Sequence, residues 1–258
     1  TIDECARWAN QQRSTLGFVP TMGALHEGHL SLVKKSTGVC SKSLVSIYIN
    51  PTQFAPDEDL ASYPRCLDAD LDQLKKNNID AVFLPSDAEM YPENDVGFQY
   101  QNKLFNKLEG KSRPKFFYGV TRIVFKLFNI INPTHAFFGE KDAQQSRIVQ
   151  KMISDLNLNI EFLSCPTIRD DNGLALSSRN NYLTLKEQEQ ASLLYKSLML
   201  VKTEIINGEN EVGLLKDIFK NALLQNSKFK LDYISVACNL SLEELTLTTS
   251  DMLISTAV

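Results

Sequence analysis

Two of the three histidines in this 258-residue chain lie three positions apart, at His26 and His29. The run Leu16-Gly-Phe-Val-Pro20 precedes them and predicts a buried strand, and a helix is expected to begin near His29. At the first strand-to-helix junction of an open α/β sheet, helix amides face bound phosphates, and glycines such as Gly23 let the phosphates come close. The pair therefore predicts a nucleotide site in which two imidazoles add hydrogen-bond donors.

The expected charge of the pair depends on what is bound. The positive end of the helix dipole disfavours an imidazolium, whereas a triphosphate with about three to four negative charges favours one. Bound nucleotide is therefore expected to protonate the site. Two other interpretations stay open, namely surface histidines in a loop and an H-x-x-H metal site, for which no third ligand stands out. The third histidine, His135, follows Pro133 and is interpreted as structural.

A second polar segment, Asn50-Pro-Thr-Gln-Phe54, directly follows the run Ser43-Leu-Val-Ser-Ile-Tyr-Ile49, which predicts another strand. Neighbouring parallel strands open into one crevice at their carboxyl ends, so Asn50 and Gln53 are expected to point into the same site. Their amides donate and accept hydrogen bonds without carrying charge, which suits a hydroxy acid. An ordinary polar loop is the alternative.

The third segment, Phe137-Phe-Gly-Glu-Lys-Asp-Ala-Gln-Gln145, runs from a buried strand that ends at Gly139 into a helix. Lys141 has the reach of a mobile point charge and suits a phosphate. Asp142 is expected either to hold Mg²⁺ or to orient the lysine. Gln145 begins the helix on the side of the crevice. The alternative is a solvated charged turn.

The fourth segment spans residues 167–180 and contains the turn sequence Asp171-Asn-Gly173, followed by Ser177, Ser178 and Arg179. The planar fork of Arg179 matches phosphate oxygens, and its charge gains value as negative charge develops in a transition state. A polar domain linker is the alternative interpretation.

The elements around these segments alternate between strand and helix. Further strands are expected at Ala81–Leu84, Ala136–Phe138 and Ile160–Leu163, and helices at His29–Lys35, Leu67–Asn77, Val120–Ile131 and Gln145–Leu156. In the second of these helices, Leu67, Leu71 and Leu74 form the expected apolar face. Such alternation implies an α/β fold with a parallel sheet that is covered on both faces.

The pattern changes after about Arg169, so we expect one domain at residues 1–167 and a smaller α+β domain at residues 168–258. A capping box at Thr184 predicts a long helix to about Ile206, ended by Asn207-Gly208. The remaining elements expected are a helix at Glu211–Leu224, strands at Leu231–Ala237 and Met252–Val258, and a short helix at Leu242–Leu245.

Composition excludes several classes of protein. The chain has 27 Lys and Arg against 31 Asp and Glu, a net charge of −4, which argues against general binding of nucleic acids or membrane surfaces. No apolar run approaches the roughly 18 residues of a membrane-spanning helix, and the charged start of the chain does not resemble a secretory signal. The five cysteines are unpaired in spacing and are expected to be reduced and mostly buried. A cytoplasmic protein of the size of an enzyme is the resulting expectation.

Taken together, the four segments resemble the pantoate–β-alanine ligase family, the pantothenate synthetases of coenzyme A biosynthesis. Residues Pro20-Thr-Met-Gly-Ala-Leu-His-Glu-Gly-His29 also fit the H-x-G-H motif of the nucleotidyltransferase superfamily, and Gly139-Glu-Lys-Asp-Ala-Gln-Gln145 and Ser177-Ser-Arg-Asn180 make the set specific. The similarity is dense over residues 15–183 and weak beyond them.

The resemblance implies a Rossmann-like parallel sheet with helices on both faces and a smaller C-terminal α+β lid domain. It implies an enzyme that condenses (R)-pantoate with β-alanine through a pantoyl adenylate, releasing AMP and pyrophosphate. ATP with Mg²⁺ would be a substrate, with the metal held through the ATP phosphates and assigned to no protein side chain. No organic prosthetic group, nucleic acid or membrane is implied, and the expected assembly is a homodimer.

The resemblance also implies roles for individual residues. His26, His29, Lys141 and Arg179 would be catalytic, with His29 as proton donor. Gln53 would contact both pantoate and β-alanine, and Gln145 would contact pantoate, with Asn50 in the same substrate site. The residues expected to bind ATP are Met22, Gly23, Ala24, Leu25, His26, Glu27, Gly28, His29, Gly139, Glu140, Lys141, Asp142, Ile168, Leu176, Ser177, Ser178 and Arg179.

The chain departs from the family pattern between Arg113 and Arg122. Members usually read Arg-Pro-Gly-His-Phe-x-Gly-Val-x-Thr, whereas this chain has Lys115, Phe116 and Arg122 at altered positions. Leu176 replaces a usual methionine at nearly equal volume. Two alternatives remain open. A transferase that stops at adenylyl or cytidylyl transfer would need no pair of glutamines, and an inactive nucleotide sensor is opposed by the intact motifs.

Overall fold

The chain folds into two compact units, each with its own core. The computed structural model describes residues 1–95, 97–224 and 229–258. Unit 1 comprises Thr1–Asn102 and Lys115–Ile168, and unit 2 comprises Lys103–Pro114 and Arg169–Val258.

Unit 1 is built on a five-stranded sheet in the order β3-β2-β1-β4-β5, and every pairing in it is parallel. The strands are β1 (Leu16–Thr21), β2 (Lys42–Ile47), β3 (Ala81–Phe83), β4 (His135–Gly139) and β5 (Glu161–Cys165). The predicted α/β fold with a parallel sheet is therefore confirmed. From β1 the chain adds strands first on one side of the sheet, β2 and β3, and then on the other side, β4 and β5. The loops after β1 and β4 therefore flank the crevice in which α/β sheets bind ligands.

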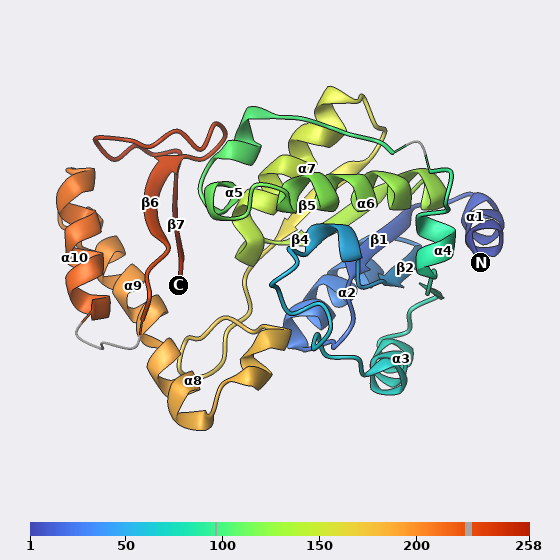
Figure 1. Ribbon diagram of the computed structural model, residues 1–258, viewed down its shortest axis with the longest axis horizontal. Coiled ribbons are helices and arrows are strands. Elements are labelled where there is room, and N and C mark those ends of the chain that lie inside the picture. The colour runs from blue at the N-terminus through green and yellow to red at the C-terminus, as the bar shows by residue number, and fades with distance from the viewer. Residues whose placement is uncertain (96, 225–228) are drawn as a thin grey trace. The chain divides into compact units, whose positions relative to one another are not determined.

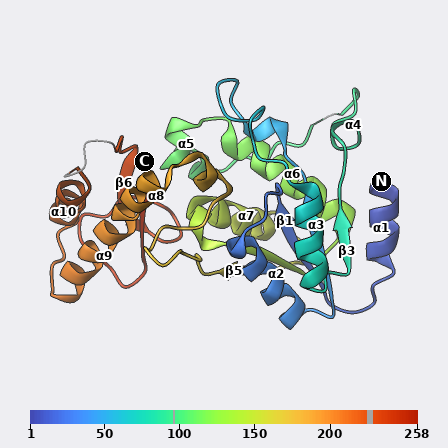
Figure 2. The same cartoon turned by 90° about the horizontal axis from the view of Figure 1, so that it is seen from below.

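Helices cover both faces of this sheet (Figures 1 and 2). On one face Val33 of α2 and Leu74 of α3 cluster with Val19 and Phe137. On the other face Phe128 of α6 packs edge-on against Phe18, with 6.2 Å between the ring centroids. The helices of unit 1 are α1 (Ile2–Asn10), α2 (Glu27–Val39), α3 (Leu67–Lys76), α4 (Asp87–Met90), α6 (Phe116–Ile131) and α7 (Ala143–Asp155), with short 3-10 helices η1 (Pro51–Gln53) and η3 (Glu140–Asp142).

The described part of unit 2 contains an antiparallel pair of strands and the longer helices α8, α9 and α10. Its elements are η2 (Lys103–Asn106), α5 (Glu109–Ser112), η4 (Ser178–Tyr182), α8 (Leu185–Ala191), α9 (Leu193–Ile206), α10 (Val212–Leu224), β6 (Tyr233–Cys238) and β7 (Met252–Ala257). Helices α9 and α10 contribute Val201, Leu215 and Phe219 to a core that includes Ile234 of β6.

The division into units differs from the expected domains in two respects: Ile168 belongs to unit 1, and an internal segment belongs to unit 2. Residues 103–114 lie within the range 1–167 but group with unit 2. Two of its contacts with the rest of unit 2 are polar, since Lys107 forms an ion pair with Glu243 and the Ser112 hydroxyl donates to Asp232 at 2.8 Å. These partners are more than a hundred residues away in sequence, so no local pattern announces them.

Three predictions about elements were wrong. The long helix after Thr184 is two helices, because the buried Ser192 bonds back to the carbonyl of Glu189 at 2.6 Å and interrupts the backbone ladder. The short helix at Leu242–Leu245 is absent, since Leu242 has a φ of +52° and the segment pairs with β6 instead. Leu67 is exposed, and in its place the face of α3 that packs inward carries Asp70 with Leu74.

One helix was missed, and the burial of the cysteines was predicted only in part. Helix α1 was not predicted, although Thr1 and Glu4 form a capping box at its start. Cys5, Cys40 and Cys165 are buried, whereas Cys66 is exposed and Cys238 lies between these extremes. Within residues 1–95, 97–224 and 229–258, no helix combines the length and the apolar character needed to cross a membrane.

Candidate active site

The two histidines of the H-x-G-H segment stack against each other at the start of α2. Their ring centroids are 4.1 Å apart and the planes are tilted by 38°. The helix begins at Glu27, two residues earlier than expected, so that His26 becomes its N-cap. The Nδ1 atom of His26 accepts a hydrogen bond from the Gly28 amide at 3.1 Å. Since Nδ1 is the acceptor, the neutral His26 ring carries its proton on Nε2 and can donate it to a ligand.

His29 occupies a desolvated position one turn into the helix. Its Nδ1 atom is fully buried and has no hydrogen-bond partner in the described part of the chain, although the residue as a whole is half-buried. Burial, which is the largest cause, and the neighbouring His26 together lower the pKa of His29 to about 3. Burial and the charge of Lys141 also lower the pKa of His26. Both rings are therefore neutral at pH 7 without ligand, which argues against the interpretation as ordinary surface histidines.

The turn after β4 lies close enough to act electrostatically on this histidine pair. The positive charge of Lys141 and the negative charge of Asp142 both shift the pKa values of His26 and His29. Lys141 Nζ lies 3.2 Å from Asp142 Oδ1, and both side chains are exposed. This ion pair favours the interpretation in which Asp142 orients the lysine. The structure thus stacks His26 on His29 and places the charge of Lys141 within electrostatic range of both rings.

Residues around this turn leave room for a ligand. No atom lies within 4 Å of the point where a Cβ on Gly139 would be, and its φ of −84° is ordinary for any residue. Neither neighbouring atoms nor backbone strain therefore require glycine at this position. Gln145 lies half-buried in the first turn of α7, which begins directly after η3.

Gln53 is held in a defined orientation by Asn50. Asn50 is 1% exposed, and its Oδ1 accepts from the Thr52 amide while its Nδ2 donates to the carbonyl of Gly119 at 3.2 Å. These two backbone partners fix which side of the Asn50 amide is oxygen. Its Nδ2 also donates to Gln53 Oε1 at 3.0 Å, so the Gln53 Nε2 group points towards Met22, whose Sδ lies 3.1 Å away.

Sequence reasoning missed the groups that support these side chains. Asp70 of α3 accepts hydrogen bonds from the amides of Ala24 and Leu25. The hydroxyl of Tyr91 donates to Asn50 at 2.7 Å, and Gly119 of α6 lies directly against η1. One signal was available for Asp70, because an acidic residue four positions before a buried leucine interrupts the apolar face of a helix.

The remaining predicted ATP-binding residues lie at the end of unit 1 and in unit 2. Ile168 is the last residue of unit 1 and is 36% exposed. The side chain of Ser177 caps η4 by accepting from the Arg179 amide, Ser178 is buried and Arg179 is exposed. Leu176 to Arg179 belong to unit 2, so their convergence on the histidine pair stays a prediction.

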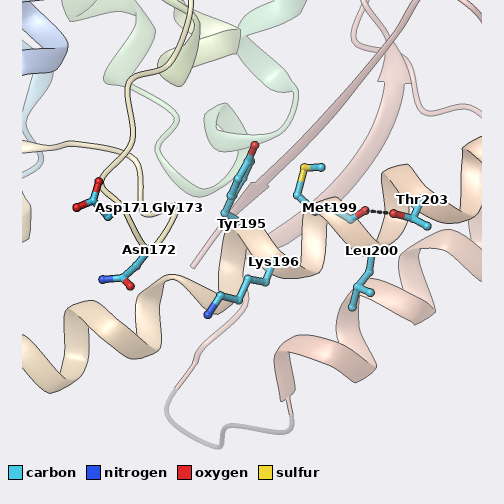
Figure 3. Close-up of a pocket in the computed structure, with 8 residues that line it drawn as sticks. All are labelled: Asp171, Asn172, Gly173, Tyr195, Lys196, Met199, Leu200 and Thr203. Carbon is cyan, nitrogen blue, oxygen red and sulfur yellow. Dashed lines mark hydrogen bonds between the residues drawn. The ribbon is translucent and has the colours of Figure 1, made fainter.

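A separate cavity of about 520 Å³ lies within unit 2 (Figure 3). The turn Asp171–Gly173 forms one side, and Tyr195, Lys196, Met199 and Leu200 of α9 form the other. None of its lining residues belongs to the predicted site. In the described ranges, no group of three or more His, Cys, Asp or Glu residues is placed to hold a metal ion. His135, at the start of β4, instead contacts Glu161 and Thr134.

Comparisons with known proteins identify the family of the chain. The family model described as pantoate-beta-alanine ligase matches residues 1–258. The chain is 45% identical over 246 residues to the pantothenate synthetase of Thermotoga neapolitana, which covers 94% of this chain and 88% of that protein. It is 44% identical over 252 residues to the pantothenate synthetase of Clostridium botulinum, with 98% and 89% coverage.

Solved structures give the same result. A crystal structure of pantothenate synthetase from Thermus thermophilus has a TM-score of 0.94 and 35% identity, covering 100% of this chain and 93% of that chain. The pantoate-beta-alanine ligase from Francisella tularensis, complexed with beta-gamma ATP and beta-alanine, has a TM-score of 0.77 and 33% identity, with 100% and 95% coverage. This chain belongs to the pantoate-beta-alanine ligase family.

Proposed function

We propose that this protein condenses (R)-pantoate with β-alanine in an ATP-dependent reaction that yields pantothenate, AMP and pyrophosphate. The observation that carries the proposal is the stacked pair His26 and His29 at the start of α2, with the charge of Lys141 acting on both rings. Family membership supports the same activity. The relative from Francisella tularensis, which was complexed with beta-gamma ATP and beta-alanine, supports these two substrates.

In the first step, a pantoate carboxylate oxygen would bond to the α-phosphorus of ATP as the bond to the bridging oxygen of pyrophosphate breaks. Negative charge grows on the oxygens around phosphorus, and donors that are already in place stabilise it. His26 offers its Nε2 proton, and Lys141 offers an ammonium group whose charge already acts on His26. Bound triphosphate favours the protonated rings, so we assign His29 as the proton donor.

In the second step, the amine of β-alanine would attack the acyl carbon of pantoyl adenylate. The new C–N bond replaces the bond to the AMP oxygen, and the amine loses a proton. We place Gln53 between the two acid substrates because Asn50 directs its Nε2 group towards Met22 of the nucleotide loop. Gln145, at the start of α7, is assigned to pantoate.

Four further assignments are proposals that rest on the family resemblance. Arg179, Leu176, Ser177 and Ser178 would bind the nucleotide from unit 2, which would act as a lid that keeps water from the adenylate. Magnesium would arrive with the ATP phosphates. The protein would be a homodimer, which sedimentation analysis tests, and it would work in the cytoplasm, which fractionation of the source cells tests.

The exchange of labelled pyrophosphate into ATP, measured without β-alanine, tests the proposed reaction. We expect exchange that requires pantoate, because only a reversibly formed pantoyl adenylate returns pyrophosphate to ATP. Addition of β-alanine should then release pantothenate and AMP in equal amounts. Release of ADP and phosphate would refute the adenylate route, and exchange without pantothenate formation would support a transferase that stops at nucleotidyl transfer.

A pair of histidine variants separates catalysis from folding. His29→Ala should lower the exchange rate by at least about 100-fold, as expected for the loss of a transition-state donor. The matched control is His135→Gln, which removes the third histidine of the chain outside the predicted site and should retain the exchange rate. Near-normal exchange by His29→Ala would remove His29 from its assigned role.

A further inference from the structure

Asp70 is a buried carboxylate without a cationic partner. It lies in the first turn of α3 and is 1% exposed, and within the described residues no lysine, arginine or histidine forms an ion pair with it. Its oxygens accept two backbone hydrogen bonds, from Ala24 N to Oδ2 at 2.8 Å and from Leu25 N to Oδ1 at 2.7 Å. Burial of a charge is unfavourable unless its hydrogen-bonding capacity is used, so these two bonds account for its presence.

The loop whose amides donate these bonds has an unusual backbone. Gly23 and Ala24 are consecutive residues with positive φ, at +81° and +49°. The left-handed conformation disfavours alanine, and it persists where surrounding contacts enforce it. A Cβ on Gly23 would lie 3.0 Å from both Asp70 Oδ2 and Ile47 Cγ2, so the loop is pressed between α3 and β2.

This loop connects the two halves of the proposed site. At the start of the loop, the side chain of Met22 contacts Gln53. At its end, Leu25, whose amide is bonded to Asp70, directly precedes the N-cap residue His26. We infer that Asp70 is a positioning residue that fixes the nucleotide loop Met22–Leu25 and thereby places His26 at the start of α2. This inference rests on the proposed function for its kinetic consequence but not for its structural one.

A carboxylate is required because both of its partners are donors. Asparagine at position 70 would supply one acceptor and would turn an NH₂ group towards the second backbone amide. Two donors would then face each other in a buried site, which is unfavourable. Helix α3 offers a matched control, because Asp72 is exposed on the same helix and loses the same charge in Asp72→Asn.

Ring NMR signals of the histidines test the structural consequence without any activity. The chain has only three histidines, and His135 serves as an internal reference remote from the loop in sequence. In the ligand-free protein we expect Asp70→Asn to shift the ring ¹⁵N signals of His26 and to leave those of His135 in place. Asp72→Asn should leave all of them unchanged. Unaltered His26 signals in a folded Asp70→Asn protein would overturn the inference.

Kinetics and hydrogen exchange complete the test. Asp70→Asn should lower pantoate-dependent pyrophosphate exchange by about 10²-fold, as expected for a displacement of about 1 Å at a catalytic group. It should lower kcat and raise the KM for ATP. Asp72→Asn should keep an exchange rate near that of wild type. If wild type shows no exchange, the proposed function fails while the NMR result still decides the role of Asp70. If Asp70→Asn does not fold, amide exchange of wild type decides, because slow exchange at Ala24 and Leu25 supports the inference and fast exchange overturns it.

Discussion

A single methyl group added to Gly119 tests whether the contact between α6 and η1 sets the position of Gln53. In Gly119→Ala the new Cβ would lie 2.5 Å from the carbonyl carbon of Thr52 and 2.7 Å from Cα of Gln53, and closer still to the Thr52 oxygen. Carbon atoms pack comfortably at about 3.5 Å. The η1 segment must therefore retreat from α6 by about 1 Å.

The expected cost combines two opposing effects. Overpacking of this kind destabilises proteins by about 1–3 kcal/mol, while alanine inside a helix gains up to about 1 kcal/mol over glycine. The net loss of folding free energy is then of the order of 1–2 kcal/mol. The effect on turnover is larger in relative terms, because a displacement of about 1 Å at a group that holds a substrate costs about 10²-fold.

The assay compares steady-state kinetics for each substrate with thermal unfolding. Gly119→Ala should lower kcat/KM for pantoate about 100-fold and leave the KM for ATP within about threefold, because η1 carries Gln53 and not the nucleotide loop. Gly38→Ala is the matched control, since Gly38 lies in α2 and a Cβ there meets no atom within 4 Å. It should keep full activity and equal or greater stability.

Two results would refute this reasoning. Wild-type kcat/KM for pantoate in a Gly119→Ala protein would show that the backbone contact does not set the position of Gln53. An equal loss of affinity for ATP and for pantoate would show general disruption of unit 1. A loss confined to pantoate and β-alanine supports the contact as the cause.

Two other predictions concern pH and thiol chemistry. Burial lowers the pKa of His29 to about 3 in the folded chain, against an ordinary value near 6.5. Between these two pH values the unfolded chain binds a proton at His29 that the folded chain does not bind. The free energy of unfolding therefore decreases as pH falls from about 6.5 to about 3. The urea midpoint should therefore fall more between pH 7 and pH 5 for wild type than for His29→Gln, and parallel curves would contradict the pKa shift. Maleimide labelling of the native protein, read by mass spectrometry, should modify the exposed Cys66 first and spare the buried Cys5, whose pKa is raised to about 11 by burial; rapid labelling of Cys5 would contradict the fold of unit 1.

The parallel sheet was predictable because local sequence carries its signal. The central strands β1 and β4 are short and mostly apolar, and both faces of the sheet are covered, so no alternation of polar residues obscures the pattern there. The positions of the start of α2 and of the turn after β4 were also predictable from local sequence, because glycines and charged residues follow the strands β1 and β4 directly.

The supports of the site were not predictable, because they depend on contacts between distant segments. Asp70 meets a loop some 45 residues earlier, and Asn50 meets a carbonyl 69 residues later. Neither partner is a side chain, so residue types alone cannot reveal the pairing. The break at Ser192 shows a related limit, because a serine can continue a helix or interrupt it, and burial decides which occurs.

The mixed origin of unit 2 has a consequence for recombination between relatives. The chain passes from one unit to the other three times, after Asn102, Pro114 and Ile168. A chimaera that exchanges only the C-terminal part at Ile168 would join foreign β6 and β7 to a resident segment 103–114, and would separate partners such as Lys107 and Glu243. A functional chimaera therefore needs both segments of unit 2, residues 103–114 and 169–258, from the same parent. This requirement makes exchange of the C-terminal part alone less frequent among functional recombinants.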